Sequence, residues 1–455
     1  MGFIPRMSLL ECLRFQTGLL ALLGFIPGER KNRATSLLGF CLATCILLGN
    51  WFCGVLQCAG FYYLFTINEL AEGNTGHKVN PLIKAFTWTP FIFICGRAAI
   101  VLTIFFIKRP KWQRIVEMTD GLMNSFYGGD HDRNLVEFQK WKRLSKSLLI
   151  VSLFSHVGWE VLEWRNFMIG TGKADLWAKD ALSPLPWDIA LWEYLIIWTL
   201  CSTVPYLLSQ VVFSVIILFG RFLSSCLCKI VTSIEVLEKA LIENVVLGDF
   251  KRSHAVADEL TRLHRLHFQV AEFGHFLSDT YGLILFVIYG LDVMTILGFV
   301  ATVIVGTVKS IIGRIMLGYS ILAFGMYATL FLFPLVQVHE QGHRINSALY
   351  SLTVTASHIM QTVQGYSLRI VSQAFLTATK DRVLGFHGAG IIHITRGFLA
   401  ATFTLILSFA VVTNEFVDKA TKTGCEMAGG VAAVHEETPF ALRDLIANVT
   451  HHPDV

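Results

Sequence analysis

The residues with the clearest chemical signature are His339, Glu340 and His343, which form an HExxH pattern. On a helix this spacing places two imidazoles on one face beside a general base, which is the arrangement of zinc metalloproteases. Two features oppose this chemistry. Gly342 weakens the helix, and the next acidic residue is Asp381, so no third ligand lies at near spacing. An integral-membrane zinc protease is therefore the alternative function, and the favoured one has no catalytic or metal-binding residue.

Two further charged residues, Arg97 and Asp292, lie deep within apolar segments. An ionisable group in a membrane costs free energy unless it faces a cavity, a ligand or a partner. Asp292 is therefore a candidate ligand-binding residue, and Arg97 is a candidate partner in a structural ion pair. A secondary transporter built on these two charges is a third interpretation, but the sequence contains no inverted repeat to support it.

The composition of the chain indicates a membrane protein, because 54% of its residues are hydrophobic and only 15% are charged. A soluble protein carries about 25% charged residues. Runs that are long and apolar enough to cross a bilayer recur along the chain, so we predict an all-α integral membrane protein without a cofactor. Its seven transmembrane helices are expected at about 37–67, 82–107, 147–170, 189–225, 281–308, 315–337 and 388–416.

The positive charge alternates between successive loops. Residues 1–36 contain five Lys and Arg residues, the 68–80 loop contains one, and the 108–146 loop contains nine. Basic loops remain in the cytoplasm, so the N-terminus is predicted inside and the C-terminus outside. The predicted organisation is a cytoplasmic N-terminus (1–36), transmembrane helices 1–4 (37–225), a cytoplasmic helical extension (226–280), helices 5–6 (281–337), cytoplasmic anchor helices (338–387), helix 7 (388–416) and an extracellular tail (417–455).

The predicted cytoplasmic pieces carry apolar stripes at helical spacing, separated by a break at Gly248-Asp249. Such faces must be buried, and we expect them to pack against one another and against a neighbouring subunit. The stripes consist of Ile230, Ile234, Leu237, Leu241 and Val245, then Val256, Leu260, Leu263, Leu266 and Val270, and finally Ile345, Leu349 and Leu352.

Helix 7 carries a stripe of mostly small or polar residues on an otherwise apolar surface. Its members are His393, Gly397, Ala400, Thr404, Ser408, Val411 and Glu415. One interpretation is close helix packing, since small residues let backbones approach. The other is a face turned to water, in which several copies of Glu415 form a carboxylate ring that attracts cations. An acid this close to a span favours the second interpretation.

The outer halves of helices 2–6 contain aromatic and polar side chains that suit a small uncharged ligand of polar or bitter type, through stacking and hydrogen bonding. The alternative is an interfacial aromatic belt at the ends of the spans. No basic stripe predicts nucleic-acid binding. The candidate ligand-binding residues are Lys84, Trp88, Trp159, Glu163, Trp192, Glu193, Trp198, Asp292, Tyr319 and Tyr327.

The end of helix 7 resembles a known family signature. Ser408-Phe409-Ala-Val-Val-Thr-Asn-Glu415-Phe416 is similar to the motif that ends the last helix of insect gustatory receptors: Thr-Tyr, five mostly apolar residues, then Gln-Phe. Ser, Phe and Glu replace Thr, Tyr and Gln. The segment Leu384-Gly-Phe-His-Gly-Ala-Gly-Ile-Ile resembles the Gly-aromatic approach to that helix, and residues 339–349 resemble the family's polar helix after helix 6.

The resemblance implies a chemosensory, ligand-gated, non-selective cation channel in the plasma membrane, related to odorant receptors. Its partners would be a small-molecule tastant, permeating cations and membrane lipid, and it would form a homotetramer or a heterotetramer with related subunits. Helix 7 of each subunit would line the pore. The predicted pore residues are Thr404, Ser408, Phe409, Val411, Val412, Glu415 and Phe416, of which Ser408 and Phe409 match positions that couple helix 7 to its neighbours.

Overall fold

The structure is a computed structural model, and it describes residues 9–27, 33–72, 81–127, 131–169, 196–246, 252–305, 311–329, 332–359, 363–381 and 384–427. The chain divides into two compact units, Met1–Ala410 and Val411–Val455, with the boundary inside the last helix. Most of the predicted extracellular tail lies outside the described residues.

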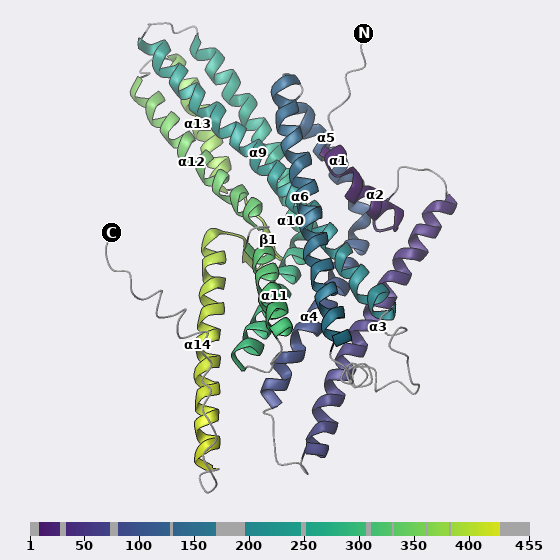
Figure 1. Cartoon of the computed structure of the whole chain (residues 1–455). Coiled ribbons are helices and arrows are strands. Elements are labelled where there is room, and N and C mark those ends of the chain that lie inside the picture. Colours follow the sequence, from purple (N-terminus) through teal and green to yellow (C-terminus); the bar gives the residue numbers. More distant parts are fainter. Residues whose placement is uncertain are drawn as a thin grey trace. The chain divides into compact units, whose positions relative to one another are not determined.

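The described chain is almost entirely helical, which confirms the predicted all-α class (Figure 1). The 3-10 turn Arg109–Lys111 separates α4 from α5, because Pro110 lacks the N–H group that a continuous helix needs. The helices are α1 (Leu9–Cys12), α2 (Arg14–Leu22), α3 (Arg33–Glu72), α4 (Pro81–Lys108), α5 (Trp112–Tyr127), α6 (His131–Ile169), α9 (Val204–Val246), α10 (Arg252–Val305), α11 (Ile311–Thr329), α12 (Phe333–Ile359), α13 (Val363–Asp381) and α14 (Arg396–Met427).

Within the described residues, four helical stretches are long and apolar enough to cross a membrane: Ser36–Ala59, Ile196–Glu243, Ala255–Val305 and Arg396–Val417. They overlap predicted helices 1, 4, 5 and 7. The shorter apolar stretch Gly313–Met326 falls largely within predicted helix 6, and α4 and α6 run through predicted helices 2 and 3. Helices therefore occupy all seven predicted positions of a multi-pass membrane protein, but predicted helix 6 (315–337) was wrong as a single helix, because α11 ends at Thr329 and α12 begins at Phe333.

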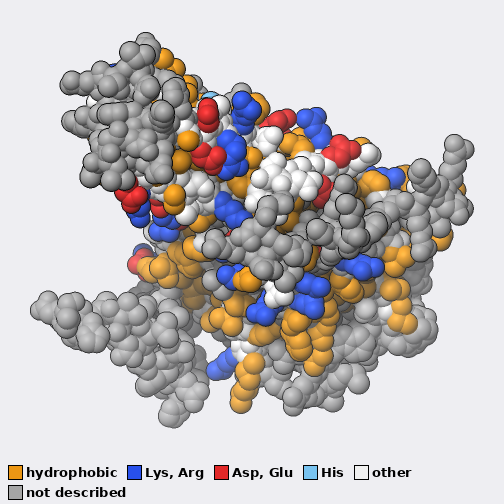
Figure 2. All heavy atoms as spheres, turned by 90° about the horizontal axis from the view of Figure 1, so that it is seen from above, with side chains coloured by type: hydrophobic (Ala, Val, Ile, Leu, Met, Phe, Trp, Pro, Cys, Tyr) orange, Lys and Arg blue, Asp and Glu red, His pale blue; other side chains and the backbone are white. Residues whose placement is uncertain are grey.

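Helices α9 and α10 contain 43 and 54 residues, whereas a bilayer span requires about 20. At about 1.5 Å per residue, α10 is roughly 80 Å long, which exceeds the hydrocarbon core by about 50 Å. The excess length forms a helical extension at one end of the bundle, where α9, α10, α12 and α13 lie side by side (Figure 1). Figure 2, seen from this end, shows acidic and basic side chains interspersed over the exposed face.

Segments that were predicted to share the cytoplasmic side meet near this extension. Gln16 of α2 donates a hydrogen bond to Ser145 Oγ of α6 at 2.7 Å. Lys229 of α9 lies 3.3 Å from Glu137 of α6. Helix α12 packs along α9. These contacts join the N-terminal segment, the 108–146 region, the 226–280 region and the helix after predicted helix 6 to one another, and the side of the membrane on which they lie stays a prediction.

Most residues of the predicted apolar stripes are buried inside this single chain; in the first stripe Ile230, Ile234 and Leu241 are buried, Leu237 is half-buried, and the side chain of Val245 lies outside the described residues. Ile345, Leu349 and Leu352 of α12 are completely buried, and all five stripe residues between 256 and 270 are buried. Each fully buried aliphatic side chain contributes about 1.5–3 kcal/mol of transfer free energy. The predicted packing of these helices against one another is therefore present within one subunit, and packing against a neighbouring subunit stays a prediction.

The helix that leads into α9 contains a π-helical turn, Thr199–Thr203. Pro205 cannot donate to the carbonyl of Cys201, so the regular hydrogen-bond pattern is interrupted there. In the amide orientation that satisfies both of its polar ends, the fully buried Asn50 of α3 donates to the Cys201 carbonyl at 3.2 Å. A side chain from another helix therefore satisfies a backbone group that proline leaves free inside the bundle.

A short antiparallel hairpin, β1 (His387–Gly388) and β2 (Ile392–His393), precedes α14. Its turn contains Ala389 and Gly390 at φ 55° and 74°. The hairpin lies close against α10 at Gly282, where a Cβ atom would lie 2.3 Å from the His387 carbonyl oxygen. Glycine at 282 is what permits this contact.

The hairpin corrects the predicted start of helix 7. Helix α14 begins at Arg396, not at 388, and Thr395 caps it by accepting a hydrogen bond from the Phe398 amide at 3.2 Å. His393, which was predicted to begin the polar stripe, lies in β2 instead. The helix also continues to Met427, beyond the predicted end at 416.

Candidate functional site

The buried centre of the helix bundle contains an ion pair between α4 and α10. Arg97 Nε lies 2.7 Å from Asp292 Oδ1, and each side chain is only 1% exposed. A second guanidinium nitrogen donates to Asp292 Oδ2 at 3.4 Å. The candidate ligand-binding residue Asp292 is therefore bound by Arg97 in this structure, which is the structural pairing that the sequence had left open.

Helix α9 supplies the remaining partners of the guanidinium. Arg97 donates to Ser209 Oγ at 2.8 Å and lies 5.2 Å from the centre of the Tyr206 ring. The Gln210 amide oxygen, in the orientation that the network favours, accepts from both terminal nitrogens at 3.3 Å. A buried charge is tolerated when its hydrogen-bonding capacity is satisfied in this way. The network joins three helices that are far apart in the sequence.

One turn before Asp292, Tyr289 connects α10 to α14. The rings of Tyr289 and Phe398 have centroids 4.6 Å apart, and the hydroxyl groups of Tyr289 and Thr402 are hydrogen-bonded. Sequence reasoning did not select these three residues. The available signal was a tyrosine deep in an apolar segment, since a buried phenol hydroxyl requires a polar partner.

Only three of the predicted ligand-binding residues have described side chains. Asp292 is paired with Arg97, and Trp198 is buried beside the π-helical turn. Tyr319 of α11 is half-buried and donates to the Phe154 carbonyl of α6 at 3.2 Å. The other side chains, of Lys84, Trp88, Trp159, Glu163, Trp192, Glu193 and Tyr327, lie outside the described residues.

The predicted pore residues lie on α14. Thr404 and Ser408 are exposed and Phe409 is half-buried in the first unit, and Val411, Val412, Glu415 and Phe416 are exposed in the second. The most apolar stretch of Arg396–Val417 has 0% of its residues buried inside the chain, against 83% for Ile196–Glu243. Within the first unit, Phe398 and Thr402 of α14 contact Tyr289 and Ile406 packs against a small core cluster, whereas Thr404 and Ser408 are exposed.

The HExxH residues lie on α12, at the junction with the hairpin. The Nε2 atoms of His339 and His343 are 3.1 Å apart. Glu340 accepts a hydrogen bond from Arg396 at 2.8 Å, so the carboxylate that a protease would use as general base is held by the first residue of α14. Burial lowers the pKa of His339. Within the described residues, no three His, Cys, Asp or Glu side chains gather closely enough to hold a metal ion.

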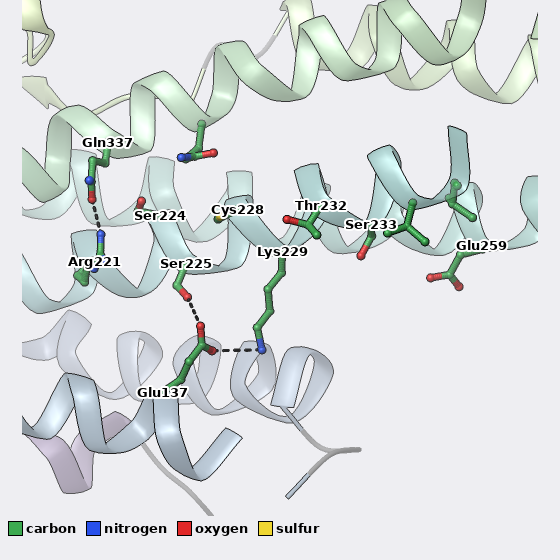
Figure 3. A pocket seen from close by; sticks show the side chains of 13 residues that line it. Glu137, Arg221, Ser224, Ser225, Cys228, Lys229, Thr232, Ser233, Glu259 and Gln337 are labelled. Atoms are coloured by element: carbon green, nitrogen blue, oxygen red, sulfur yellow. Dashed lines mark hydrogen bonds and ion pairs between the residues drawn. The ribbon is translucent and has the colours of Figure 1, made fainter. Parts of the chain in front are cut away.

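A polar cavity of about 860 Å³ lies in the extension between α6, α9, α10 and α12 (Figure 3). Ser225 donates to Glu137 at 3.2 Å, and Lys229 lies 3.3 Å from the same carboxylate. Arg221 is hydrogen-bonded to Gln337. Sequence reasoning did not predict this cavity, because its lining combines one face of α9 with distant helices. The two basic residues that line the cavity, Arg221 and Lys229, already have partners within the chain, so the cavity shows no preference for an anionic or a cationic ligand.

Comparisons with known proteins match this architecture. The 7tm Chemosensory receptor family model matches residues 13–413. The structure of the insect olfactory receptor OR5 from Machilis hrabei in complex with eugenol is similar, with a TM-score of 0.64, 14% identity, and coverage of 90% of this chain and 99% of that chain. A second structure of the insect olfactory receptor OR5 from Machilis hrabei gives a TM-score of 0.55 at 14% identity. It covers 89% of this chain and 98% of that chain.

No curated protein matches the chain by sequence. The solved structures share its fold at low identity, and the family model covers the bundle, the extension, the hairpin and most of α14 up to residue 413. This family consists of receptors, which removes the zinc protease alternative. The protein belongs to the 7tm chemosensory receptor family.

Proposed function

We propose that this receptor is a gustatory receptor that acts as a ligand-gated, non-selective cation channel in the plasma membrane. Its N-terminus lies in the cytoplasm and its C-terminus outside, as the distribution of Lys and Arg indicates. A small-molecule tastant binds in the outer half of the helix bundle. The helical extension is the cytoplasmic anchor, and α14 lines the pore in a homotetramer or a heterotetramer with related subunits.

The observation that carries this proposal is the exposed surface of α14, which combines apolar and polar side chains. Its apolar stretch has no buried residue inside the chain, yet its exposed surface includes Thr404, Ser408 and Glu415. Lipid covers apolar side chains without cost, but a carboxylate at a membrane span requires water or a partner. Several copies of α14 around a water-filled axis satisfy both surfaces, with polar residues toward the pore and a ring of Glu415 that attracts cations.

The contacts of Tyr289 support a route from ligand to pore. Tyr289 lies one turn from Asp292 on α10 and contacts Phe398 and Thr402 on α14. A ligand that changes the packing of the bundle would therefore change the support of α14. The olfactory receptor with the similar fold was solved with eugenol, a small molecule, and this agrees with a small-molecule ligand for the present chain.

Whole-cell recording during application of a tastant panel tests the proposal. We expect at least one compound to evoke a current that reverses near 0 mV, as a non-selective cation pore requires. Glu340→Gln is the matched control, because it removes the carboxylate of the HExxH pattern while leaving the predicted pore and ligand residues unchanged, and it should retain most of the current. A receptor at the cell surface that binds tastants without any current would refute the channel.

A further inference from the structure

His339 and His343 form a pair of converging imidazoles one turn apart on α12. Their Nε2 atoms are 3.1 Å apart and their ring planes are inclined by 86°. His343 is exposed and His339 is half-buried, so an ion can reach both from water. In a tetrahedral zinc site with Zn–N distances of about 2.0–2.1 Å, two ligand nitrogens lie about 3.3 Å apart. The observed separation is close to that of a two-imidazole chelate.

The other side of the His339 ring is held by the chain that leads to α14. The ring is hydrogen-bonded to the backbone of Leu384, and its Nδ1 lies beside Gly385. A backbone carbonyl that accepts from Nδ1 fixes the tautomer in which Nε2 carries a free lone pair. Metal-binding histidines are oriented by the same kind of contact. The Leu384 backbone lies close to α12 at Gly342, where a Cβ atom would make an ordinary contact at 3.4 Å with the Leu384 carbonyl oxygen.

We propose that His339 and His343 bind one divalent transition-metal ion of the zinc type. Imidazole nitrogens favour Zn²⁺, Ni²⁺ and Cu²⁺ over Ca²⁺ and Mg²⁺, which prefer oxygen ligands. Because no three potential ligand side chains converge within the described residues, water completes the coordination. The site is therefore open and reversible, unlike a closed structural zinc site, and it is not a catalytic centre because Glu340 is held by Arg396.

The position of the pair gives the ion a regulatory consequence, which rests on the proposed channel function. His339 contacts the backbone at Leu384, three residues before β1, and Glu340 pairs with the first residue of α14. An ion that immobilises the His339 ring also holds the Leu384 contact. Zinc on the extension side of the receptor should therefore restrain the start of α14 and change the ligand-evoked current.

Zinc titration of the purified, untagged full-length protein tests the binding site directly. Isothermal calorimetry gives the affinity, and Co²⁺ absorption reports imidazole coordination. We expect His339→Gln and His343→Gln each to weaken binding by more than about 10-fold, since loss of an outer-shell partner alone costs about 10–100-fold. His264→Gln is the control, because it removes a half-buried imidazole of α10 that stacks on Phe375 instead. Equal zinc affinity in wild type and both variants, or no binding by wild type, would overturn the site.

Inside-out patches test the regulatory role. With ligand present, Zn²⁺ at the cytoplasmic face should change the current of wild type and His264→Gln, and His343→Gln should lose this response. Because His343 is exposed, its substitution leaves the buried packing intact. Zinc that binds in the titration but leaves every current unchanged would refute regulation. The absence of any ligand-evoked current would instead refute the channel, and the titration would still decide whether the metal site exists.

Discussion

The hydrogen bond between Tyr289 and Thr402 predicts a measurable energetic coupling between α10 and α14. Tyr289→Phe removes the hydroxyl but preserves the ring that stacks on Phe398 with centroids 4.6 Å apart. A neutral intramolecular hydrogen bond contributes about 0.5–1.5 kcal/mol net. Since 1.4 kcal/mol corresponds to a tenfold change in an equilibrium constant, losing the bond should shift the half-maximal ligand concentration by about twofold to tenfold.

A double-mutant cycle separates this coupling from general disturbance. Tyr289→Phe and Thr402→Val remove the same bond from opposite sides, so both should shift the dose–response curve in the same direction. The double variant should differ little from either single variant. Tyr281→Phe is the matched control on the same helix, because Tyr281 is buried and stacks on Phe105 at 5.8 Å without contacting α14. Additive shifts would refute the idea that this bond supports α14.

Three other perturbations have defined outcomes. Asp292→Ala should destabilise the receptor by about 3–5 kcal/mol, because it leaves Arg97 buried without its counter-charge. In thermal unfolding, the Arg97→Met, Asp292→Leu double variant should recover much of this lost stability. A double variant as unstable as the single one would contradict this account. Burial, together with the neighbouring His264, lowers the pKa of His267 in the extension to about 4. Folding thus disfavours protonation of His267, so its contribution to stability should be full above about pH 6.5 and fall by roughly 3 kcal/mol as the pH drops toward 4. His267→Gln should flatten the dependence of the free energy of unfolding on pH in this range. An unchanged dependence would exclude His267 as the cause. Glu415→Gln should reduce cation preference or conductance, and an unchanged current–voltage relation would remove Glu415 from the pore.

The amino-acid sequence by itself determined the all-α membrane class of the protein and the rough positions of its long apolar helices. The length of an apolar segment and the spacing of its apolar residues are properties of contiguous residues, so both can be predicted without the tertiary structure. The completely buried Ile345, Leu349 and Leu352 illustrate this, since their spacing alone specified a face that had to be covered. Charge bias predicted a common side for distant segments that contact one another in the structure, and that side stays a prediction.

The local sequence pattern gave a wrong prediction where the structure of a short segment depends on its contact with a distant helix. Residues 388–395 continue the apolar character of helix 7, so they were predicted to be helical. In the structure they belong largely to a hairpin that lies against Gly282 of α10, and no local propensity reports that contact. The same limit applies to the HExxH residues. Their spacing suggested metal chemistry, but only the fold revealed that Arg396 binds Glu340 and that Leu384 orients His339.

Tertiary structure decided which polar groups meet inside the bundle. The sequence identified Asp292 as a residue that needed a partner, but Arg97 lies 195 positions away, and the choice between an ion pair and a ligand contact depends on which faces of α4 and α10 approach each other. Tyr289 and Thr402, 113 positions apart, were paired for the same reason. Helix formation follows from short-range hydrogen bonding and hydrophobic length, whereas these pairings depend on helix rotation and packing, which are set by the whole bundle.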